Sequence, residues 1–369
     1  MARYIHEQDD WPNFKWKDAA LANELAAVRH RQGLLLGRMQ VMGFHQRELT
    51  ALDSLTDDVQ KSSEIEGEHL DRLQVRSSLA RRLGIDVGAL VPADRQVEGV
   101  VEMILDAMTQ FDTPLTAERL FGWHASLFPT GRSGMWRIRV GAWREDNNGP
   151  MQVVSGGISS ERVHYEAPAA SALETEMTTF LNWFEGTHDT DRVIKAALAH
   201  LWFVMIHPFE DGNGRIARAV ADLALARSEL SGQRYYSMSA QILKEKNSYY
   251  DVLEKTGKGT VDVTLWISWF LRCLDRALAG AEATIDQVVA KAKFWDRIAD
   301  VEINERQRLM LNKLLDGFEG KLTTVKWSKI AKCSHDTALR DIQDLIGKSV
   351  LEMDPAGGRS SSYSLRFDA

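Results

Sequence analysis

The sequence predicts a mainly α-helical protein with a β-hairpin near its middle and a winged-helix-like C-terminal domain. Apolar residues recur at helical spacing over most of the 369 residues, as Leu21, Leu25, Val28 and Leu35 do near the start. The stretch from Trp136 to Pro168 is instead rich in Gly, Ser, Asn and β-branched residues, which is typical of a hairpin. After residue 290 the expected order is helix, helix, hairpin. We therefore divide the chain into residues 1–95, 96–290 and 291–369.

The helices of the first two parts can be placed from periodicity and capping residues. Leu49 to Leu83 predicts two helices with a break around Gly67. Thr113 to Thr116 opens a helix with a threonine cap, and acidic Glu118 follows in its first turn. Three further helices are expected at Val97–Met108, Ala170–Phe184 and Thr190–Met205. The predicted hairpin consists of Met151–Ser155 and Glu161–Tyr165, joined by Gly156 and Gly157.

The last part of the chain carries the signals of a winged helix. We expect a short strand at Leu322–Val325, helices at Asn304–Leu315, Trp327–Lys332 and Asp336–Ile346, and a final hairpin of Val350–Met353 with Tyr363–Arg366. From Val301 to Ala369 there are 11 Lys and Arg against 10 Asp and Glu. The candidate recognition helix carries Asp336, Asp341 and Asp344 against Arg340, and Arg359 would lie at the wing tip. Because so neutral a surface contacts phosphates poorly, DNA is an unlikely partner, and we expect a protein-interaction or dimer-forming role.

Composition and charge exclude several classes of protein. The net charge is 45 − 52 = −7, which disfavours nucleic acid as the main partner. Cys273 and Cys333 lie 60 positions apart, so neither a disulfide framework nor a zinc site is expected. The N-terminus is charged where a signal peptide needs an apolar core, and the longest apolar run, Ala196–Ile206, is too short to span a bilayer. These features predict a cytoplasmic protein without membrane attachment.

The most informative segment runs from His207 to Arg218 and reads His-Pro-Phe-Glu-Asp-Gly-Asn-Gly-Arg-Ile-Ala-Arg. A Gly-x-Gly loop that opens a helix lets main-chain N–H groups approach phosphate oxygens. Arg215 and Arg218 are three positions apart and share a helix face, so both can reach one polyphosphate. Asp211 is placed to hold Mg²⁺, and His207, with an ordinary pKa of about 6.5, can take a proton from a hydroxyl. Nucleotidyl transfer needs this combination of groups.

The segment resembles the motif of the Fic family, His-x-Phe-x-Asp/Glu-Gly-Asn-Gly-Arg-x-x-Arg, at every specified position. The resemblance implies a Fic-type helical core in which His207 is the general base, Phe209 anchors the loop and Asp211 holds Mg²⁺. It further implies an anion hole and two phosphate-binding arginines, formed by Gly212, Asn213, Gly214, Arg215 and Arg218. The kinase branch of the family has Lys where this chain has Gly214, so the small residue favours transfer of AMP. The implied reaction moves AMP from ATP to a Ser, Thr or Tyr hydroxyl of a target protein or of the enzyme itself.

Two other segments also resemble parts of Fic proteins. Ser239 to Leu253 is similar to the segment beside the nucleoside, although Lys246 stands where the family often has Arg. Tyr249 and Tyr250 either stack on the base or pack on the core. Asn247 could hydrogen-bond the adenine. The hairpin corresponds to a flap that captures the target segment by strand addition. The residues of this target-docking flap are Val153, Val154, Val163 and His164.

An inhibitory motif is expected near the N-terminus. Ser62 and Glu66 are four positions apart and share a helix face. The segment Ser62–Gly67 resembles the Fic inhibitory motif Ser/Thr-x-x-x-Glu-Gly/Asn, whose glutamate pairs with the second arginine of the catalytic loop, here Arg218. That pairing prevents productive placement of the γ-phosphate. The start of the chain, Trp11 to Trp16, is also similar to an N-terminal domain of bacterial Fic proteins.

Two other functions remain open on sequence alone. One is a hydrolase that removes AMP from a modified protein, with Glu66 orienting the water. The other is a DNA-binding regulator whose Fic core senses a nucleotide.

Overall fold

The computed structural model describes residues 2–88, 90–147, 149–155, 162–315, 318, 320–355 and 361–366. Its contacts divide the chain into two compact units, Met1–Ala281 and Glu282–Ala369. The predicted mainly helical class is confirmed in both. The domain boundaries expected after residues 95 and 290 stay predictions.

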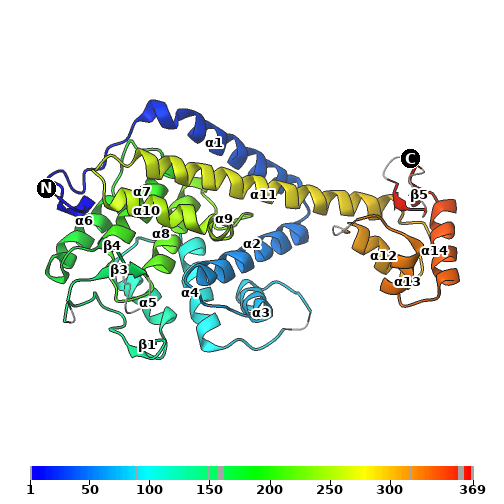
Figure 1. Ribbon diagram of the computed structural model, residues 1–369, viewed down its shortest axis with the longest axis horizontal. Helices are drawn as coiled ribbons and strands as arrows, with labels where there is room; N and C mark the ends of the chain where they lie inside the picture. Colours follow the sequence, from blue (N-terminus) through cyan, green and yellow to red (C-terminus); the bar gives the residue numbers. More distant parts are fainter. Residues whose placement is uncertain are drawn as a thin grey trace. The chain divides into compact units, whose positions relative to one another are not determined.

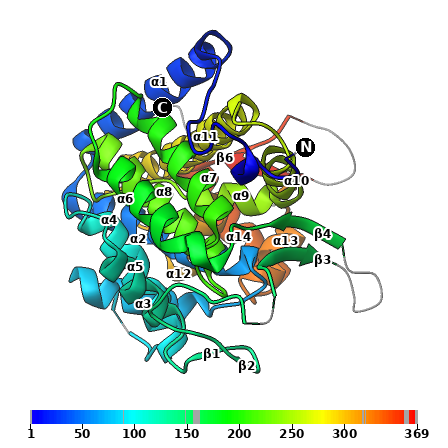
Figure 2. The same cartoon turned by 90° about the vertical axis from the view of Figure 1, so that its left-hand side faces the viewer.

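The first unit is built around two neighbouring helices, α7 (Arg192–Ile206) and α8 (Asn213–Glu229). Figure 2 shows them side by side, with α6 (Leu173–Glu185) next to α7. Nearly every side chain of α7 is buried, as its continuous apolar sequence predicts. α4 (Arg95–Thr109) and α5 (Ala117–Leu127) pack on α8. The catalytic loop of the sequence analysis is the connection between α7 and α8, and it is held by the most buried helices of the unit.

The N-terminal residues add a second layer of helices to this core (Figure 1). After a short 3-10 helix, η1 (Ile5–Glu7), the chain forms helices α1 (Asp18–Val41), α2 (Phe44–Ile65) and α3 (Arg72–Leu83). The helices α9 (Met238–Lys244), α10 (Lys246–Gly257) and α11 (Thr264–Arg297) follow the core helices in the chain. Helix α2 packs on α3, α8 and α9, and it carries the inhibitory motif to its last turn. The expected break near Gly67 is confirmed, because Gly67 follows α2 with a φ of +85° that glycine adopts without strain.

The middle of the unit contains two short hairpins. The first, β1 (Arg132–Ser133) with β2 (Trp136–Arg137), was not expected from the sequence. The predicted hairpin is present as β3 (Gln152–Ser155) and β4 (Arg162–Glu166), visible at the side of the unit in Figure 2. Its register shifts between Val153 and Val154, which marks a bulge. The expected Gly156–Gly157 connection and Glu161 lie outside the described residues.

Three helices and a hairpin form the second unit. They are α12 (Glu305–Leu315), α13 (Thr324–Ile330), α14 (His335–Gly347), β5 (Leu351–Met353) and β6 (Tyr363–Leu365). Their shared core contains Met310, Trp327 and Ile342. The order agrees with the expected one, and the winged-helix interpretation itself stays a prediction. Arg359 and the Gly-Gly turn lie outside the described residues.

Two expectations for the second unit were wrong. The strand at Leu322–Val325 is not formed, because the Thr323 hydroxyl accepts the Lys326 N–H at 3.3 Å and caps α13, which then begins at Thr324. The strand preference of the β-branched residues is therefore weaker here than the helix-capping effect of Thr323. Asp341 was counted as an outward-facing acid, but it is buried and paired with Arg306 at 2.9 Å.

Among the described residues, every helix is too short or too polar to cross a membrane.

Candidate active site

His207 occupies a special backbone position at the end of α7. Its φ and ψ of 52° and 58° are left-handed, which ends the helix and turns the chain into the loop. Its Nδ1 lies 3.2 Å from the Val204 carbonyl, a contact that places the proton on Nδ1 and leaves Nε2 as a proton acceptor. Burial lowers the pKa of His207 from 6.5 to about 4. The imidazole is thus neutral at pH 7 and ready to accept a proton.

Arg144 holds the main chain of His207 in this conformation. Its guanidinium is buried and donates to the His207 carbonyl at 2.8 Å, to the Pro168 carbonyl and to Asp146. Its own N–H donates to the Pro208 carbonyl at 2.9 Å. The sequence analysis missed Arg144, because no spacing distinguishes it from the other arginines of the same stretch.

The loop after His207 is anchored in the core by an aromatic stack. Phe209 is fully buried, and its ring stacks on His124 with centroids 4.2 Å apart. The Asn213 side chain bonds both the N–H (2.9 Å) and the carbonyl (2.7 Å) of Phe209. The side chain of Asn213 therefore holds the two ends of the loop together through hydrogen bonds to Phe209. Only its main-chain N–H is left to donate a hydrogen bond to an anion. Gly212, with a φ of +80°, lets α8 begin at Asn213.

Asp211 lies at the edge of this loop with its carboxylate already oriented. One oxygen accepts the Gly212 N–H at 2.5 Å and the other accepts the Ser133 hydroxyl. Ser133 belongs to the unexpected β1–β2 hairpin, so sequence spacing could not have connected it with Asp211. The part of the chain that the structure describes contains no group of three His, Cys, Asp or Glu that could hold a metal ion. A magnesium ion at Asp211 would thus take most of its oxygen ligands from phosphates and water, as is usual for this ion.

The structure brings the predicted inhibitory residues to the second arginine of the loop. Arg218 is buried and forms an ion pair with Glu66, with 2.8 Å between Nη2 and Oε1. It also donates to the Ser62 hydroxyl at 2.9 Å and to the Ser62 carbonyl at 2.8 Å. Burial lowers the pKa of Arg218, but Glu66, Tyr249 and Tyr250 together raise it by more, so the net shift is upward. Among the described residues, the second Nη of Arg218 makes no hydrogen bond of good geometry, so it has capacity to donate to a ligand.

Glu66 also lies against the first turn of α8. A β-carbon placed on Gly214 would stand only 2.2 Å from Oε1 of Glu66. The carboxylate therefore occupies the position at the helix N-terminus where main-chain N–H groups and the helix dipole favour an anion. It stands where a phosphate group would be bound by the same elements.

Arg215, the first arginine of the loop, has a carboxylate partner that the sequence analysis missed. Its Nη1 lies 2.6 Å from Oε2 of Glu68, and its guanidinium lies over the Phe128 ring at 5.1 Å. Glu68 also accepts a hydrogen bond from Gln96 at 3.1 Å. This pairing could have been suspected from the sequence Glu66-Gly67-Glu68. The turn at Gly67 brings Glu68, a second carboxylate after Glu66, to the loop between α7 and α8.

The segment beside the loop separates the two tyrosines. Tyr249 is buried, and its hydroxyl is 2.8 Å from Nε2 of His200, so it packs in the core. Tyr250 is 41% exposed, and its hydroxyl lies 3.4 Å from the carbonyl of Ile65, next to Glu66. Of the two, Tyr250 is the one that can stack on a base. Asn247 is exposed in the first turn of α10.

The flap residues fall into two groups. Val154 is exposed and Val153 and Val163 are half-buried, and in the described residues each strand of the hairpin pairs on one side only. The outer edges thus retain N–H and carbonyl groups that an extended segment could pair with. His164 is differently placed, because its ring lies between the Ser155 hydroxyl (2.5 Å) and Glu254 of α10 (2.6 Å). It holds the hairpin on α10 and is not free to contact a target.

The loop between α7 and α8 thus combines a neutral histidine, glycines and two buried arginines, and comparisons with known proteins place it in a matched family region. Residues 114–225 match the model of the Fic/DOC family, and residues 4–85 match a domain of unknown function (DUF4172). The chain therefore contains a Fic domain.

Among curated relatives, "Protein adenylyltransferase Fic" of Nematostella vectensis is 30% identical over 113 residues. The protein of the same name from Drosophila yakuba is 25% identical over 218 residues, and "Uridine 5'-monophosphate transferase" of Xanthomonas campestris is 30% identical over 131 residues. The matches cover 30%, 58% and 32% of this chain, and 25%, 39% and 22% of those relatives' own lengths.

Solved structures share the fold. A Fic family protein from Desulfovibrio desulfuricans superposes with a TM-score of 0.52 at 21% identity, covering 94% of this chain and 95% of that one. A Fic-domain protein from Bacteroides thetaiotaomicron gives a TM-score of 0.50 at 21% identity, covering 69% and 96% of the two chains.

Proposed function

We propose that this protein is an autoinhibited protein adenylyltransferase. It moves AMP from ATP to a hydroxyl group of a target protein, and of itself, and releases pyrophosphate. The observation that carries the proposal is the position of Glu66, whose carboxylate lies against Gly214 and pairs with Arg218 inside the phosphate-binding loop. The adenylyltransferase names of relatives at 25–30% identity support the choice of AMP.

In the proposed reaction, the target hydroxyl oxygen attacks the α-phosphorus of ATP. Its proton passes to Nε2 of His207, and the bond from the α-phosphorus to the bridging oxygen of pyrophosphate breaks. His207 is suited to this role because it is neutral at pH 7 and its Nδ1 is held by the Val204 carbonyl, which leaves Nε2 as the acceptor. The positive charges of Arg215 and Arg218 would stabilise the negative charge that develops on the pyrophosphate.

The residues around Asp211 fit a magnesium ion that accompanies the nucleotide. Asp211 offers a carboxylate whose orientation is fixed by Ser133 and by the Gly212 N–H. A bound Mg²⁺ would neutralise charge on the phosphates. The chain itself contributes the orientation of the carboxylate and the glycine-lined loop.

Inhibition follows from competition for one position. With Glu66 in place, its carboxylate fills the anion site of α8 and neutralises Arg218, so the terminal phosphate of ATP cannot be bound there. Removing the carboxylate leaves Arg218 buried beside Ser62 with unused donor capacity. The nucleotide would then supply the missing anion.

The test is the transfer of label from α-³²P-ATP by wild type and Glu66→Gly, with Mg²⁺, in lysate and with the purified protein. Glu64→Gly is the matched control, since Glu64 lies in the same last turn but pairs with Lys61. We expect incorporation to rise with Glu66→Gly and to stay at the wild-type level with Glu64→Gly. Equal incorporation by all three folded proteins would refute autoinhibition. Parallel reactions with γ-³²P-ATP and α-³²P-UTP separate AMP transfer from phosphate transfer and from UMP transfer.

One observation favours a second activity, removal of AMP from modified protein. The charge of Glu66 raises the pKa of His207, and both residues lie at the same loop, so we propose that Glu66 orients the attacking water. Release of free AMP from modified substrate by wild type, and its loss in Glu66→Gly, would establish hydrolysis as the function of Glu66.

A further inference from the structure

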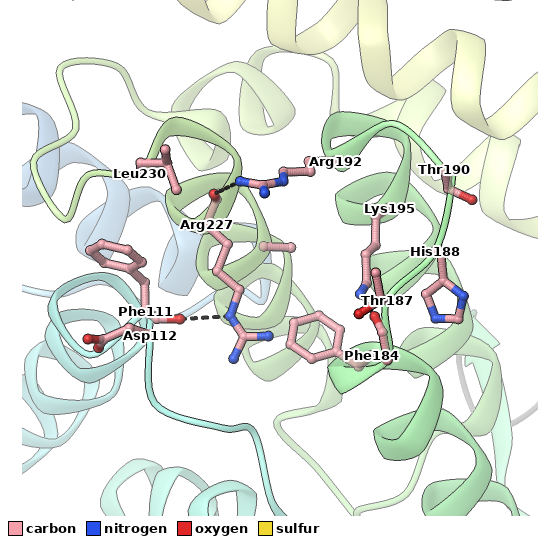
Figure 3. A pocket seen from close by; sticks show the side chains of 12 residues that line it. Phe111, Asp112, Phe184, Thr187, His188, Thr190, Arg192, Lys195, Arg227 and Leu230 are labelled. Carbon is pink, nitrogen blue, oxygen red and sulfur yellow. Dashed lines mark hydrogen bonds between the residues drawn. The ribbon is translucent and has the colours of Figure 1, made fainter.

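A pocket of about 400 Å³ lies in the first unit, away from the catalytic loop (Figure 3). We call it the α7 pocket, because Arg192 and Lys195 of α7 form one of its walls. Arg227 of α8 and Phe184 of α6 lie opposite and below, and Phe111 after α4 lies at the far side. Arg192 is the first residue of α7 and His207 follows the last, so about 20 Å of helix separates the pocket from the candidate base.

Arg227 is a fixed part of the pocket wall. It donates to the carbonyls of Phe111 at 2.7 Å and Thr113 at 3.0 Å, and it pairs with Glu185 at 2.9 Å. Its guanidinium lies over the ring of Phe184, 5.0 Å from the centroid. These contacts use most of its donors, and Glu185 balances its charge. Arg227 therefore shapes the pocket more than it attracts a ligand.

Lys195 and Arg192 are compensated less directly: the Lys195 ammonium lies over the rings of Trp183 and Phe184, at 5.6 and 5.8 Å from their centroids, and the charge of Glu185 raises its pKa. The two cations are three positions apart on α7 and share a face. The Lys195 ammonium donates to the Gly186 carbonyl at 2.9 Å, and Arg192 donates to the Arg227 carbonyl at 3.2 Å. Within the described residues, neither forms an ion pair with a carboxylate. Burial lowers the pKa of Lys195, and the charge of Arg227 lowers it further, as expected for a cation in a positive environment.

The pocket also has an apolar side. Phe111, Leu230 and the ring of Phe184 line it, and Leu230 is 73% exposed at the end of α8. The carboxylate of Asp112 lies across the pocket from Lys195 in Figure 3. A volume of this size, with apolar walls and two cations among its lining residues, has the character of a small-molecule site.

We propose that the α7 pocket binds a small organic anion. A phosphate or carboxylate group contacts Lys195 and Arg192, and an apolar body lies against Phe111 and Leu230. The anion supplies the charge partner that both cations lack. This site is separate from the nucleotide site of the proposed function and does not depend on it.

Calorimetric titration of the whole chain with phenyl phosphate, benzoate and phenol tests the proposal. We expect at least one of the two anions to bind, with the stronger one identifying the preferred charged group, and phenol to bind at least tenfold more weakly. Lys195→Met, which keeps an apolar stem of similar length, should weaken the anion at least tenfold. Arg192→Gln should also weaken it and, because Arg192 is exposed, should leave the fold intact.

Two controls separate this pocket from other cationic sites. Arg218→Ala alters the nucleotide site, and Lys329→Met removes an exposed charge in the second unit. Both variants should bind the anion as wild type does. Failure of both anions to bind wild type, or unchanged binding in folded Arg192→Gln, would overturn the proposal. Loss of binding in Arg218→Ala with full binding in Lys195→Met would assign the anion to the nucleotide site and would equally overturn it.

Discussion

The guanidinium of Arg144 donates a hydrogen bond to the carbonyl of His207 at 2.8 Å. His207 is a non-glycine residue in the left-handed region, a conformation that persists only when its surroundings hold it. Arg144 also bonds to Pro168 and Asp146, which lie outside the catalytic loop on either side of the β3–β4 hairpin. The orientation of the imidazole thus depends on a residue that never touches it.

Replacing Arg144 by Met should lower kcat at least tenfold and change the Kd for ATP by less than threefold. The reason is that Arg144 positions His207 and contacts none of the phosphate-binding residues. Both constants would be measured in the Glu66→Gly background, where the nucleotide site is open. A merely structural role would raise the Kd and lower kcat together, or leave both unchanged, and Arg144→Lys, which can replace one of the bonds, should restore part of kcat.

His207→Ala should reduce AMP transfer about 10²–10⁴-fold, the usual contribution of a general base. ATP affinity in the Glu66→Gly background should be retained, because the base acts in the transition state. Single-turnover incorporation of label from α-³²P-ATP measures the first effect and equilibrium binding the second. Transfer near the parental rate would remove His207 from the mechanism.

Arg218 should determine the effect of Glu66. Glu66→Gly speeds modification, whereas Arg218→Ala does not, because the arginine that pairs with the glutamate is also needed by the nucleotide. The double variant should behave like Arg218→Ala, a non-additivity expected for residues that share a contact. Initial rates of label incorporation by wild type, Glu66→Gly, Arg218→Ala and the double variant complete this double-mutant cycle. Additive effects would show that Glu66 acts elsewhere.

Glu68→Gln should release Arg215 as Glu66→Gly releases Arg218, with a smaller effect. The effect should be smaller because Glu68 pairs with Arg215 at 2.6 Å but, unlike Glu66, is not the side chain that lies against Gly214. We expect the rate of self-modification to rise, and to rise further when both substitutions are combined. Gln96→Ala is the control, because it removes a neighbour of Glu68 without removing charge. A rate that stays at the wild-type level in Glu68→Gln would leave Glu68 a structural partner of Arg215.

The protein should lose stability as the pH falls from about 6.5 toward 4. Burial lowers the pKa of His124 and His207 to about 4 and that of His200 to about 3. Between these values and 6.5 the unfolded chain binds protons that the native state does not, so the free energy of unfolding decreases with decreasing pH. Asp222 and Glu176, whose pKa values are raised by burial, act in the opposite direction, whereas His6, whose pKa burial lowers, acts in the same direction as the three histidines.

Urea denaturation at pH 7.5, 6.5, 5.5 and 5.0 measures this dependence. His200→Gln removes one of the three groups and should make the decrease smaller, whatever it does to stability at pH 7.5. A midpoint that does not change over this range would contradict the assignment of neutral histidines in the native core.

The catalytic loop could be predicted because its chemistry is local. One continuous segment supplies the base, the glycines, the carboxylate and both arginines, and the helices on either side follow from apolar periodicity. Glu66 was found through a short motif whose meaning depends on that loop. Its contact with Gly214 could not be predicted, since it requires the packing of α2 on α8.

The residues that support the loop were missed for the same physical reason. Arg144, Ser133 and Glu68 reach the site across 63, 78 and 147 positions of sequence, and each is a common polar residue in its own segment. No periodicity records such contacts. In the second unit, local capping by Thr323 decided between helix and strand where β-branched composition gave the opposite answer.

A β-carbon at position 214 would lie only 2.2 Å from Oε1 of Glu66. This contact links the choice of nucleotide to the restraint of the enzyme in the proposed function. A descendant of this protein that acquires a side chain at Gly214, for instance to accept a different nucleotide, must displace the carboxylate of Glu66 in the same step. On the proposed function, that displacement would also disturb the pair with Arg218 and so weaken the restraint. A change of nucleotide at this position would thus be coupled to a change of control through a shift of the Glu66 side chain.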